Sequence, residues 1–379
     1  MEFKVNSKEL EKHLNRVIPA IPSRTPMPIL ENFFFDIKDG LITIYATDLE
    51  ISLKSSFGIA AGGDISALIP AKLLHNVVRA LGDTSINFEF TENGKLILKT
   101  DNGVYTLSFL GTEDYPEIPD FPGDKLGSDE LQELTINGED LKAALDKSVF
   151  AIAKEEMRPA LTGVLFEFSE EGLRFVATDG HRLANIIYKK YKFDGEEKKQ
   201  YIVPERAVSV VTKALDEKDV KIYLSATHIS FVMNDMELIT RLIAQKYPDY
   251  SAVIPLENEF TMKIDAGVIL DVVKRMMFFS ISGTKKIKFS ISESKLEISA
   301  EDIDRGASAD ETVECEYNGE PLDIGFNSMY INDILSHLTS EKELIFNLHS
   351  PTKAVVITPA EQKEDVELMM LIMPVRLNS

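Results

Sequence analysis

The sequence is poor in the features that would place it outside the cell or in a membrane. Its 379 residues include one cysteine, Cys315, so no disulfide can form within the chain. No apolar run approaches the roughly 20 residues that a membrane-spanning helix requires. The start of the chain is charged and lacks the apolar core of a signal peptide. These features predict a cytoplasmic protein.

The sequence also lacks the motifs of common catalytic and metal sites. Its six histidines show no metal-ligand spacing. It contains no nucleophile elbow, no Walker-type phosphate loop and no dinucleotide-binding glycine motif. The most enzyme-like stretch holds Asp179 and His181, with Ser148 and Ser209 elsewhere, but a strand-end Asp followed by Gly is an ordinary turn. We therefore expect no catalytic residue, no metal and no cofactor.

The balance of charge is strongly acidic. The formal net charge is −21. Taken alone, this value argues against nucleic acid as a partner, because phosphate binding requires clustered Lys and Arg. A net charge is a sum over the whole chain, however, whereas a binding patch is a local arrangement. The distribution of basic residues along the chain therefore decides whether nucleic acid remains a candidate partner.

One pattern of helix, strands and second helix is repeated three times. The first copy opens with an expected helix at 7–20, in which Ser7 is a plausible N-cap and Leu10, Leu14 and Val17 recur at helical spacing. The later copies open with helices that begin at Asn137 and Asp265. A second helix in each copy ends near Leu81, Leu215 and Leu338.

Strands with alternating apolar residues follow the first helix of each copy. They end at Asp48, Asp179 and Asp302, so the pattern recurs after 131 and then 123 residues. This period is far longer than that of a solenoid repeat. It predicts an α+β fold of three repeated domains, each with two helices and antiparallel sheets. The expected domains are 1–125, 130–254 and 256–379.

Basic residues gather on the predicted helices, whereas acidic residues crowd strand ends, turns and linkers. On the first helix, Lys8, Lys12 and either Asn15 or Arg16 lie at helical spacing on a face away from the apolar residues. The other helices carry Lys72, Arg79, Lys142, Lys147, Arg206, Lys213, Lys274 and Arg275, and Lys285 and Lys286 follow. Mixed charge is ordinary on solvated helix faces. The alternative is a sequence-independent phosphate track, formed if all six helices line one surface.

The chain ends in an unusually apolar stretch. Residues 368–377 are apolar almost throughout, whereas chain ends are usually polar and frayed. One interpretation is a final core strand. The other is that its Met-rich end lines an adaptable apolar groove for partners. The sequence leaves both open.

Five short motifs give the chain a family resemblance over nearly its whole length. Residues 177–184, Ala-Thr-Asp-Gly-His-Arg-Leu-Ala, resemble the most recognisable motif of the bacterial DNA polymerase III beta sliding clamps. Residues 47–50 resemble its counterpart in the first domain. Residues 247–250, Phe326-Asn327 with Tyr330, and 373–377 also match in place and order. Five motifs in register on a threefold repeat make the resemblance specific.

The resemblance implies a non-enzymatic subunit of DNA-clamp fold that closes as a head-to-tail dimeric ring around double-stranded DNA. It implies partners in the polymerase III alpha subunit, the clamp loader, other polymerases and repair proteins, bound through short linear motifs, and no membrane. Its peptide-binding pocket would include Leu161, Thr178, Gly180, His181, Arg182, Leu183, Pro248, Val253, Leu371, Met373 and Pro374, with Arg158, Asn327, Tyr330, Val375 and Arg376 in a second half.

The resemblance also implies which residues contact DNA and which form the dimer interface. DNA contacts are expected from Arg24, Lys12, Lys72, Arg79, Arg206, Lys285 and Lys286. The dimer interface is expected to contain Tyr105, Leu107, Phe278 and Phe279. Departures from a well-known branch occur at Ala252, where that branch has Arg, and at Pro159 and Ala160, where it has two Tyr. Asn378 and Ser379 extend past the usual end.

Two other functions remain compatible with the residues. A multidomain scaffold would bind peptides but not DNA, and would not distinguish circular from linear DNA. An enzyme built around Asp179 and His181 would show a turnover that is lost on His181→Ala while binding persists. A clamp predicts a stable dimer that is retained on closed circular DNA.

Overall fold

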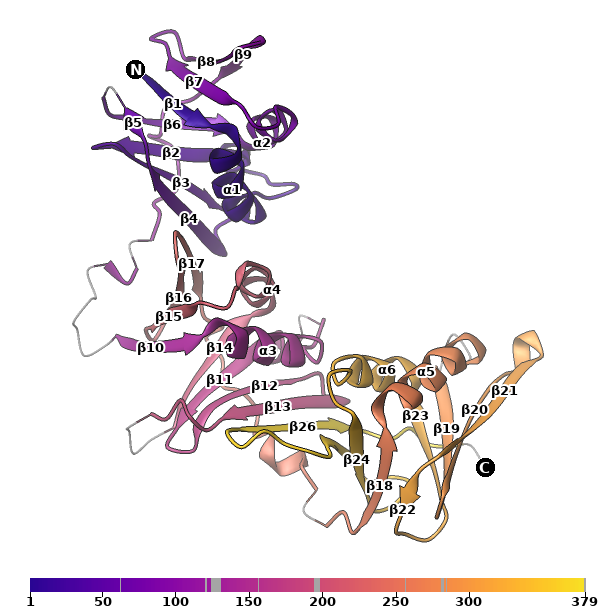
Figure 1. The fold of residues 1–379 in the computed structure, drawn as a ribbon. Helices are drawn as coiled ribbons and strands as arrows, with labels where there is room; N and C mark the ends of the chain where they lie inside the picture. The colour runs from indigo at the N-terminus through magenta and orange to yellow at the C-terminus, as the bar shows by residue number, and fades with distance from the viewer. Residues whose placement is uncertain are drawn as a thin grey trace. The chain divides into compact units, whose positions relative to one another are not determined.

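The computed structural model describes residues 1–61, 63–119, 121–123, 131–155, 157–193, 198–255, 257–280, 283 and 285–377. The domain limits expected at residues 125, 130 and 256 fall outside the described residues, as do Asn378 and Ser379. The repeated pattern of helices and strands predicted from the sequence is present in all three copies, here called the first, second and third repeats (Figure 1).

The first repeat alternates short strands with two helices. Its elements are β1 (Glu2–Asn6), α1 (Ser7–Val17), β2 (Asn32–Lys38), β3 (Leu41–Thr47), β4 (Ile51–Gly58), β5 (Ala60–Ala61), β6 (Ile65–Pro70), α2 (Ala71–Ala80), β7 (Ser85–Phe90), β8 (Lys95–Thr100) and β9 (Gly103–Ser108).

The second and third repeats follow the same order. The second contains β10 (Gln132–Asn137), α3 (Gly138–Val149), β11 (Gly163–Ser169), β12 (Gly172–Thr178), β13 (Arg182–Tyr188), β14 (Lys199–Pro204), α4 (Glu205–Ala214), β15 (Asp219–Leu224), β16 (His228–Met233) and β17 (Met236–Arg241). The third contains β18 (Phe260–Asp265), α5 (Ala266–Met276), β19 (Lys286–Ser292), β20 (Lys295–Asp302), β21 (Ala307–Glu314), β22 (Glu316–Tyr317), β23 (Leu322–Asn327), α6 (Ser328–Ser336), β24 (Glu343–Leu348), β25 (Val355–Pro359) and β26 (Val366–Ile372).

Antiparallel pairing joins each repeat to the next through its sheets. β17 of the second repeat pairs with β4 of the first, with Leu238 opposite Leu53. β26 of the third repeat pairs with β13 of the second, with Leu371 opposite Leu183. The result is an eight-stranded and a nine-stranded sheet that each continue across a repeat boundary (Figure 1).

The second repeat is consequently divided between two compact units. One unit comprises Met1–Leu141 and Ser209–Leu242, and the other comprises Lys142–Val208 and Ile243–Ser379. Each unit therefore consists of one complete repeat and the part of the second repeat whose strands extend its sheet. The expected fold class, three repeats of two helices and antiparallel sheets, is confirmed.

Helix α1 shows why the apolar spacing predicts a buried stripe. Leu10, Leu14 and Val17 are fully buried, as the period of 3.6 residues requires. The expected N-cap is wrong by one residue. Asn6 caps the helix, because its side-chain oxygen accepts from the backbone N–H of Lys8 (2.8 Å) and of Glu9 (3.4 Å). Ser7 lies inside the helix instead, and its hydroxyl donates to a carbonyl oxygen of the loop after α2.

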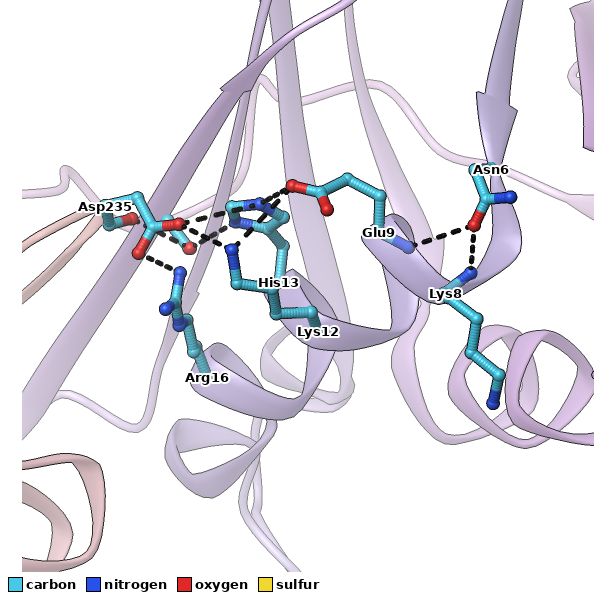
Figure 2. Close-up of polar contacts among 8 residues, drawn as sticks. Asn6, Lys8, Glu9, Lys12, His13, Arg16 and Asp235 are labelled. Carbon is cyan, nitrogen blue, oxygen red and sulfur yellow. Dashed lines mark hydrogen bonds and ion pairs between the residues drawn. The ribbon is translucent and has the colours of Figure 1, made fainter. Parts of the chain in front are cut away.

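A polar cluster holds α1 to the turn between β16 and β17 (Figure 2). Arg16 forms an ion pair with the Asp235 carboxylate, and Lys12 Nζ lies 3.2 Å from a carboxylate oxygen. The hydroxyl of Ser55 on β4 donates to the Asp235 carbonyl oxygen at 2.9 Å, and Nδ1 of buried His13 lies 2.8 Å from the same hydroxyl. Charged side chains thus fasten the first repeat to the second.

Candidate functional site

The turn after β12 is built by two short polar side chains. The Thr178 hydroxyl donates to the Arg182 carbonyl oxygen (2.7 Å) and accepts from the Gly180 N–H (3.1 Å). One Asp179 carboxylate oxygen accepts from the N–H groups of His181 (2.8 Å) and Arg182 (3.0 Å). Gly180 has φ +88°, a conformation that favours glycine. The motif therefore encodes a rigid turn that presents His181 and Arg182.

Arg182 joins this turn to the third repeat. Its Nε donates to Asp179 at 3.1 Å, and one terminal nitrogen donates to Asp333 of α6 at 2.5 Å. Its guanidinium lies 5.2 Å from the ring centre of Phe150 and 4.8 Å from that of Tyr330. The residue is buried, so this charge depends on its partners for compensation.

The apolar end of the chain runs beside the turn. β26 pairs with β13, and the N–H of Met373 then donates to the His181 carbonyl oxygen at 2.8 Å. Leu371 is buried, whereas Met373 is 37% exposed. The interpretation as a final core strand is confirmed, and Met373 after that strand lines an open hollow. Binding of partners in this hollow stays a prediction.

That hollow, here called the apolar groove, has a volume of about 570 Å³. Its lining consists of Arg158, Ala160, Leu161, Thr178, Gly180, His181, Arg182, Leu183, Lys246, Pro248, Asp249, Tyr250, Val253, Leu371 and Met373. A second hollow of about 320 Å³ shares Arg158, His181 and Arg182 with the groove and continues to Tyr330 and Asp333 on α6. Concave, mostly apolar surfaces with a few polar groups are typical of binding sites.

Two tyrosines support the groove from behind. The Tyr250 hydroxyl donates to a carboxylate oxygen of buried Glu167 at 3.0 Å. Burial raises the pKa of Tyr250, and the adjacent Glu167 charge raises it further. Burial likewise raises the pKa of Tyr247, whose ring packs against that of Tyr250. Both phenols therefore stay neutral at physiological pH and pack the groove, and Tyr250 also donates a hydrogen bond.

The structure brings most of the expected pocket residues together. Every residue expected in its first half lines the apolar groove except Pro374. Of the second half, Arg158 and Tyr330 line the two hollows. Asn327 instead caps α6, and Val375 forms a backbone bridge to Gly325. Arg376 is exposed beyond that bridge.

Sequence reasoning omitted four lining residues. Ala160, Lys246, Asp249 and Tyr250 line the groove but were not expected there. Asp249 and Tyr250 belong to a motif from which only Pro248 was taken. The signal for Tyr250 was therefore present in the sequence, whereas nothing in the sequence distinguishes Lys246 from an ordinary surface lysine.

The geometry around Asp179 does not resemble a catalytic dyad. Its carboxylate binds two backbone N–H groups and Arg182, so it orders the turn. The His181 ring stacks on Tyr330, with ring centres 5.6 Å apart. The Ser148 hydroxyl is buried and donates to carbonyl oxygens within α3. Among the described residues, no group of three or more potential ligands could hold a metal ion.

The residues expected to contact DNA lie on helices and on the loops beside them. Lys72 of α2 donates to the carbonyl oxygen of Ser23 (3.3 Å), next to exposed Arg24, and Arg79 lies exposed on the same helix. Lys12 is instead engaged by Asp235. The remaining three expected residues are Arg206 on α4, Lys285 directly before β19, and Lys286 at the start of β19.

The residues expected at a dimer interface differ in exposure. Phe278 is 80% exposed, and Phe279 follows it in a short turn after α5. Tyr105 lies partly exposed on β9, whereas Leu107 is 4% exposed and already packs inside the first repeat. Exposed Val104 lies on the same strand.

Among the helices of the described residues, none is long and apolar enough to cross a membrane.

Comparison with known proteins gives the family. The N-terminal, central and C-terminal domains of the DNA polymerase III beta subunit match residues 1–119, 135–249 and 251–376. The beta sliding clamp of Pseudomonas aeruginosa is 28% identical over the full length of both chains. The crystal structure of the P. aeruginosa DNA polymerase III subunit beta superposes over both full chains with a TM-score of 0.91 and 28% identity.

A second solved structure is similar over the same extent. The sliding clamp of Bartonella birtlesii bound to griselimycin, a DNA polymerase III subunit beta, is 30% identical over 100% of both chains, with a TM-score of 0.90. The three domain matches, in order and covering nearly the whole sequence, coincide with the three repeats of the structure. The chain therefore belongs to the DNA polymerase III beta subunit family, the bacterial beta sliding clamps.

Proposed function

We propose that this chain is a DNA sliding clamp, a processivity factor that encircles duplex DNA as a head-to-tail homodimer and tethers polymerases to it. The observation that carries the proposal is the rule by which repeats join. β17 pairs with β4 and β26 with β13, so each repeat extends the edge strand of the one before it. Repetition of this contact between two copies generates a ring.

The same rule identifies the strands that meet between copies. β9 is the edge of the five-stranded sheet of the first repeat, and β21 is the edge of the four-stranded sheet of the third. β17 and β26 are the counterparts of β9, and β4 and β13 the counterparts of β21. Pairing of β9 with β21 of a second copy therefore repeats the internal contact. Such a head-to-tail contact closes into a ring when the rotation allows.

The separation of charge suits DNA encirclement. The chain carries a net charge of −21, yet Lys72, Arg79 and the Arg24 loop gather beside α1 and α2. Basic helices facing the centre of a ring would bind phosphates weakly and without sequence preference. Acidic side chains on the opposite surface would keep DNA from binding outside the ring.

The apolar groove is the proposed docking site for partner proteins. It offers a mostly apolar lining with exposed Val253 and Met373, which fits short motifs with Leu or Phe anchors. Met373 can repack around different anchors, which suits a site shared by several partners. The partners are the polymerase III alpha subunit, the clamp loader, other polymerases and repair proteins.

The proposed function also defines the cofactor requirement, the cellular location and the domain limits of the protein. The clamp needs no cofactor and performs no chemistry of its own. It acts in the cytoplasm, where bacterial DNA is replicated. Its three repeats correspond to clamp domains 1–125, 130–254 and 256–379.

Retention on DNA tests the proposal. The protein is loaded onto a nicked circular plasmid by a clamp loader with ATP, and the plasmid is then cut once by a restriction enzyme. We expect stable retention on the circle and rapid loss on cutting, because a ring is held by topology and not by affinity. Gel filtration of protein and DNA measures the bound fraction.

A linear DNA whose two ends carry bulky protein blocks is the matched control, and it should retain the protein as the circle does. Equal release from circular and from open linear DNA would contradict encirclement. That result would favour a scaffold that binds peptides without DNA.

A further inference from the structure

The two junctions between repeats each contain a turn of the same kind, but they are held by different interactions. In the turn after β3, Thr47 donates to the Ile51 carbonyl oxygen at 2.8 Å, and Asp48 accepts from the Ile51 N–H at 2.9 Å. Thr178 and Asp179 make the same contacts with Arg182. A buried isoleucine in the first turn thus corresponds to a buried arginine in the second.

The charges of the two junctions lie in different places. At the first junction, the ion pairs lie outside the turn: residues of α1 pair with Asp235 (Figure 2), and Lys54 of β4 pairs with Glu237 of β17. At the second junction, the charge belongs to the turn itself, because Arg182 pairs with Asp333 of α6. The second junction is therefore fastened at the wall of the apolar groove, which Arg182 also lines.

Arg182 is the centre of a continuous stack of side chains. Its guanidinium lies between the rings of Phe150 and Tyr330. The stack extends outward on both sides, since Tyr330 stacks on His181 (ring centres 5.6 Å apart) and Phe150 on His337 (4.3 Å). Three of these residues belong to the second repeat, and Tyr330 of α6 and His337, which directly follows α6, belong to the third. We call Phe150, Arg182, Tyr330 and Asp333 the clasp.

The clasp restricts where Arg182 can lie. Its side chain is 7% exposed, and a buried charge that loses one partner pays a penalty that is larger than the net strength of the pair. Asp179 belongs to the same turn and moves with Arg182. Asp333 comes from α6, so it determines where the turn lies relative to the third repeat, and Phe150, which directly follows α3, holds the guanidinium from within the second repeat.

The groove depends on that position. His181 and Arg182 line it, and the His181 carbonyl oxygen accepts from the N–H of neighbouring Met373, another lining residue, at 2.8 Å. Neither Asp333 nor Phe150 is among its lining residues. Asp333 does line the second hollow, whereas Phe150 lines neither hollow. A change at Phe150 therefore reaches a bound peptide only through Arg182 and its neighbours, which makes Phe150→Leu the stricter test.

We propose that Asp333 and Phe150 are positioning residues for partner binding, which fix Arg182 and so link occupancy of the groove to closure of the junction between the second and third repeats. The inference rests on the proposed function of the groove as a peptide site. Linkage is reciprocal. If the clasp favours peptide binding, a bound peptide stabilises the clasp by the same factor.

Calorimetry with a short peptide, acetyl-Gln-Leu-Ser-Leu-Phe, tests the first half of this linkage. We expect Asp333→Asn and Phe150→Leu each to weaken binding at least fivefold, because Arg182 gains freedom that binding must remove. Glu341→Gln is the matched control. It breaks the Lys147–Glu341 ion pair (3.1 Å) at the same junction, away from the groove, and should leave affinity within twofold of the wild type.

Hydrogen exchange tests the reciprocal half. The peptide should slow amide exchange in α6 of the wild type and of Glu341→Gln, and should leave it unchanged in Asp333→Asn. A purely structural role for Asp333 would not produce this difference. Phe150→Leu retains an apolar side chain, so it remains a test if the charge variant unfolds.

The outcomes separate this inference from the function on which it rests. A wild-type protein that does not bind the peptide contradicts the groove as a peptide site. A wild type that binds, with both clasp variants weakened less than fivefold, overturns the positioning role. Slowed exchange in α6 of Asp333→Asn on peptide binding overturns the linkage.

Discussion

At the scale of single residues, the same turn carries a glycine in one repeat and a leucine in another. Gly180 has φ +88° and Leu49, at the corresponding position of the first repeat, has φ +77°. An L-residue with a side chain loses about 1–2 kcal/mol in this left-handed conformation. Leu49 is 54% exposed, so burial offsets only part of that cost. The first repeat therefore contains a strained position that the second avoids.

Replacement of Leu49 by glycine should relieve this strain. The gain of about 1–2 kcal/mol is reduced by the roughly 0.5–1 kcal/mol that glycine loses in chain entropy. We expect Leu49→Gly to raise the free energy of unfolding by about 0.5–1 kcal/mol in urea titrations followed by circular dichroism. Leu49→Ala is the control, because it shortens the side chain but keeps Cβ. Equal stabilisation by both variants would show that strain is not the cause.

At the scale of elements, α1 and the turn between β16 and β17 form a pH-sensitive pair. Burial lowers the pKa of His13, and this effect outweighs the hydrogen bond that the Glu9 carboxylate accepts from the ring and the charge of Asp235. Burial alone would raise the pKa of Asp235, but its hydrogen bonds and ion pairs with Arg16 and Lys12 produce a net lowering. Both groups bind a proton less readily in the folded state than in the unfolded state.

The sign of the pH dependence follows from linkage. Where the unfolded state binds more protons, stability falls as pH falls. The His13 contribution is therefore lost as pH drops below about 6.5, and that of Asp235 is lost below about 4. Thermal unfolding is measured from pH 8 to 3. We expect His13→Gln to reduce the loss of stability that begins at about pH 6.5, and Asp235→Asn to reduce the loss that begins at about pH 4. Wild-type slopes in both variants would refute the assignment.

The elements also show what the sequence could predict. Helices such as α1 and strands such as β12 follow from apolar periodicity, and the turn at Thr178–Arg182 from its own residues. The N-cap was placed on Ser7 because hydroxyl and amide side chains at adjacent positions give similar signals. Asp333 was not predicted at the site, because it lies 151 residues from Arg182 and only the folded chain brings them together.

At the scale of the whole molecule, the proposed seam between copies joins β9 to β21 of a second copy. Leu107 is buried within its own repeat, so a charge there would unfold the chain and not only separate the dimer. Val104 (67% exposed) and Phe278 (80%) are better probes. Large apolar side chains each contribute about 1.5–3 kcal/mol when they are buried.

Charge at the seam should separate the copies. We expect Val104→Asp with Phe278→Asp to give single chains in light scattering at micromolar concentration, with an unchanged circular dichroism spectrum. Met157→Asp is the control, because Met157 is 90% exposed but belongs to the second repeat, which contributes no strand to the proposed seam. A double variant that still has the mass of two chains would reject this seam.

The pairing of β4 with β17 has a consequence for synthesis on the ribosome. The Thr240 hydroxyl on β17 donates to the Glu50 carbonyl oxygen beside β4, and the two residues are 190 positions apart in the chain. At roughly 5–20 residues translated per second, β4 waits about 10–40 s for its neighbour. During that interval a nascent chain presents an open strand edge, the kind of surface that other strands can join. β4 carries Lys54, which later pairs with Glu237 at 2.5 Å. Until β17 emerges, that unneutralised ammonium group discourages neighbouring nascent chains from adding to the edge.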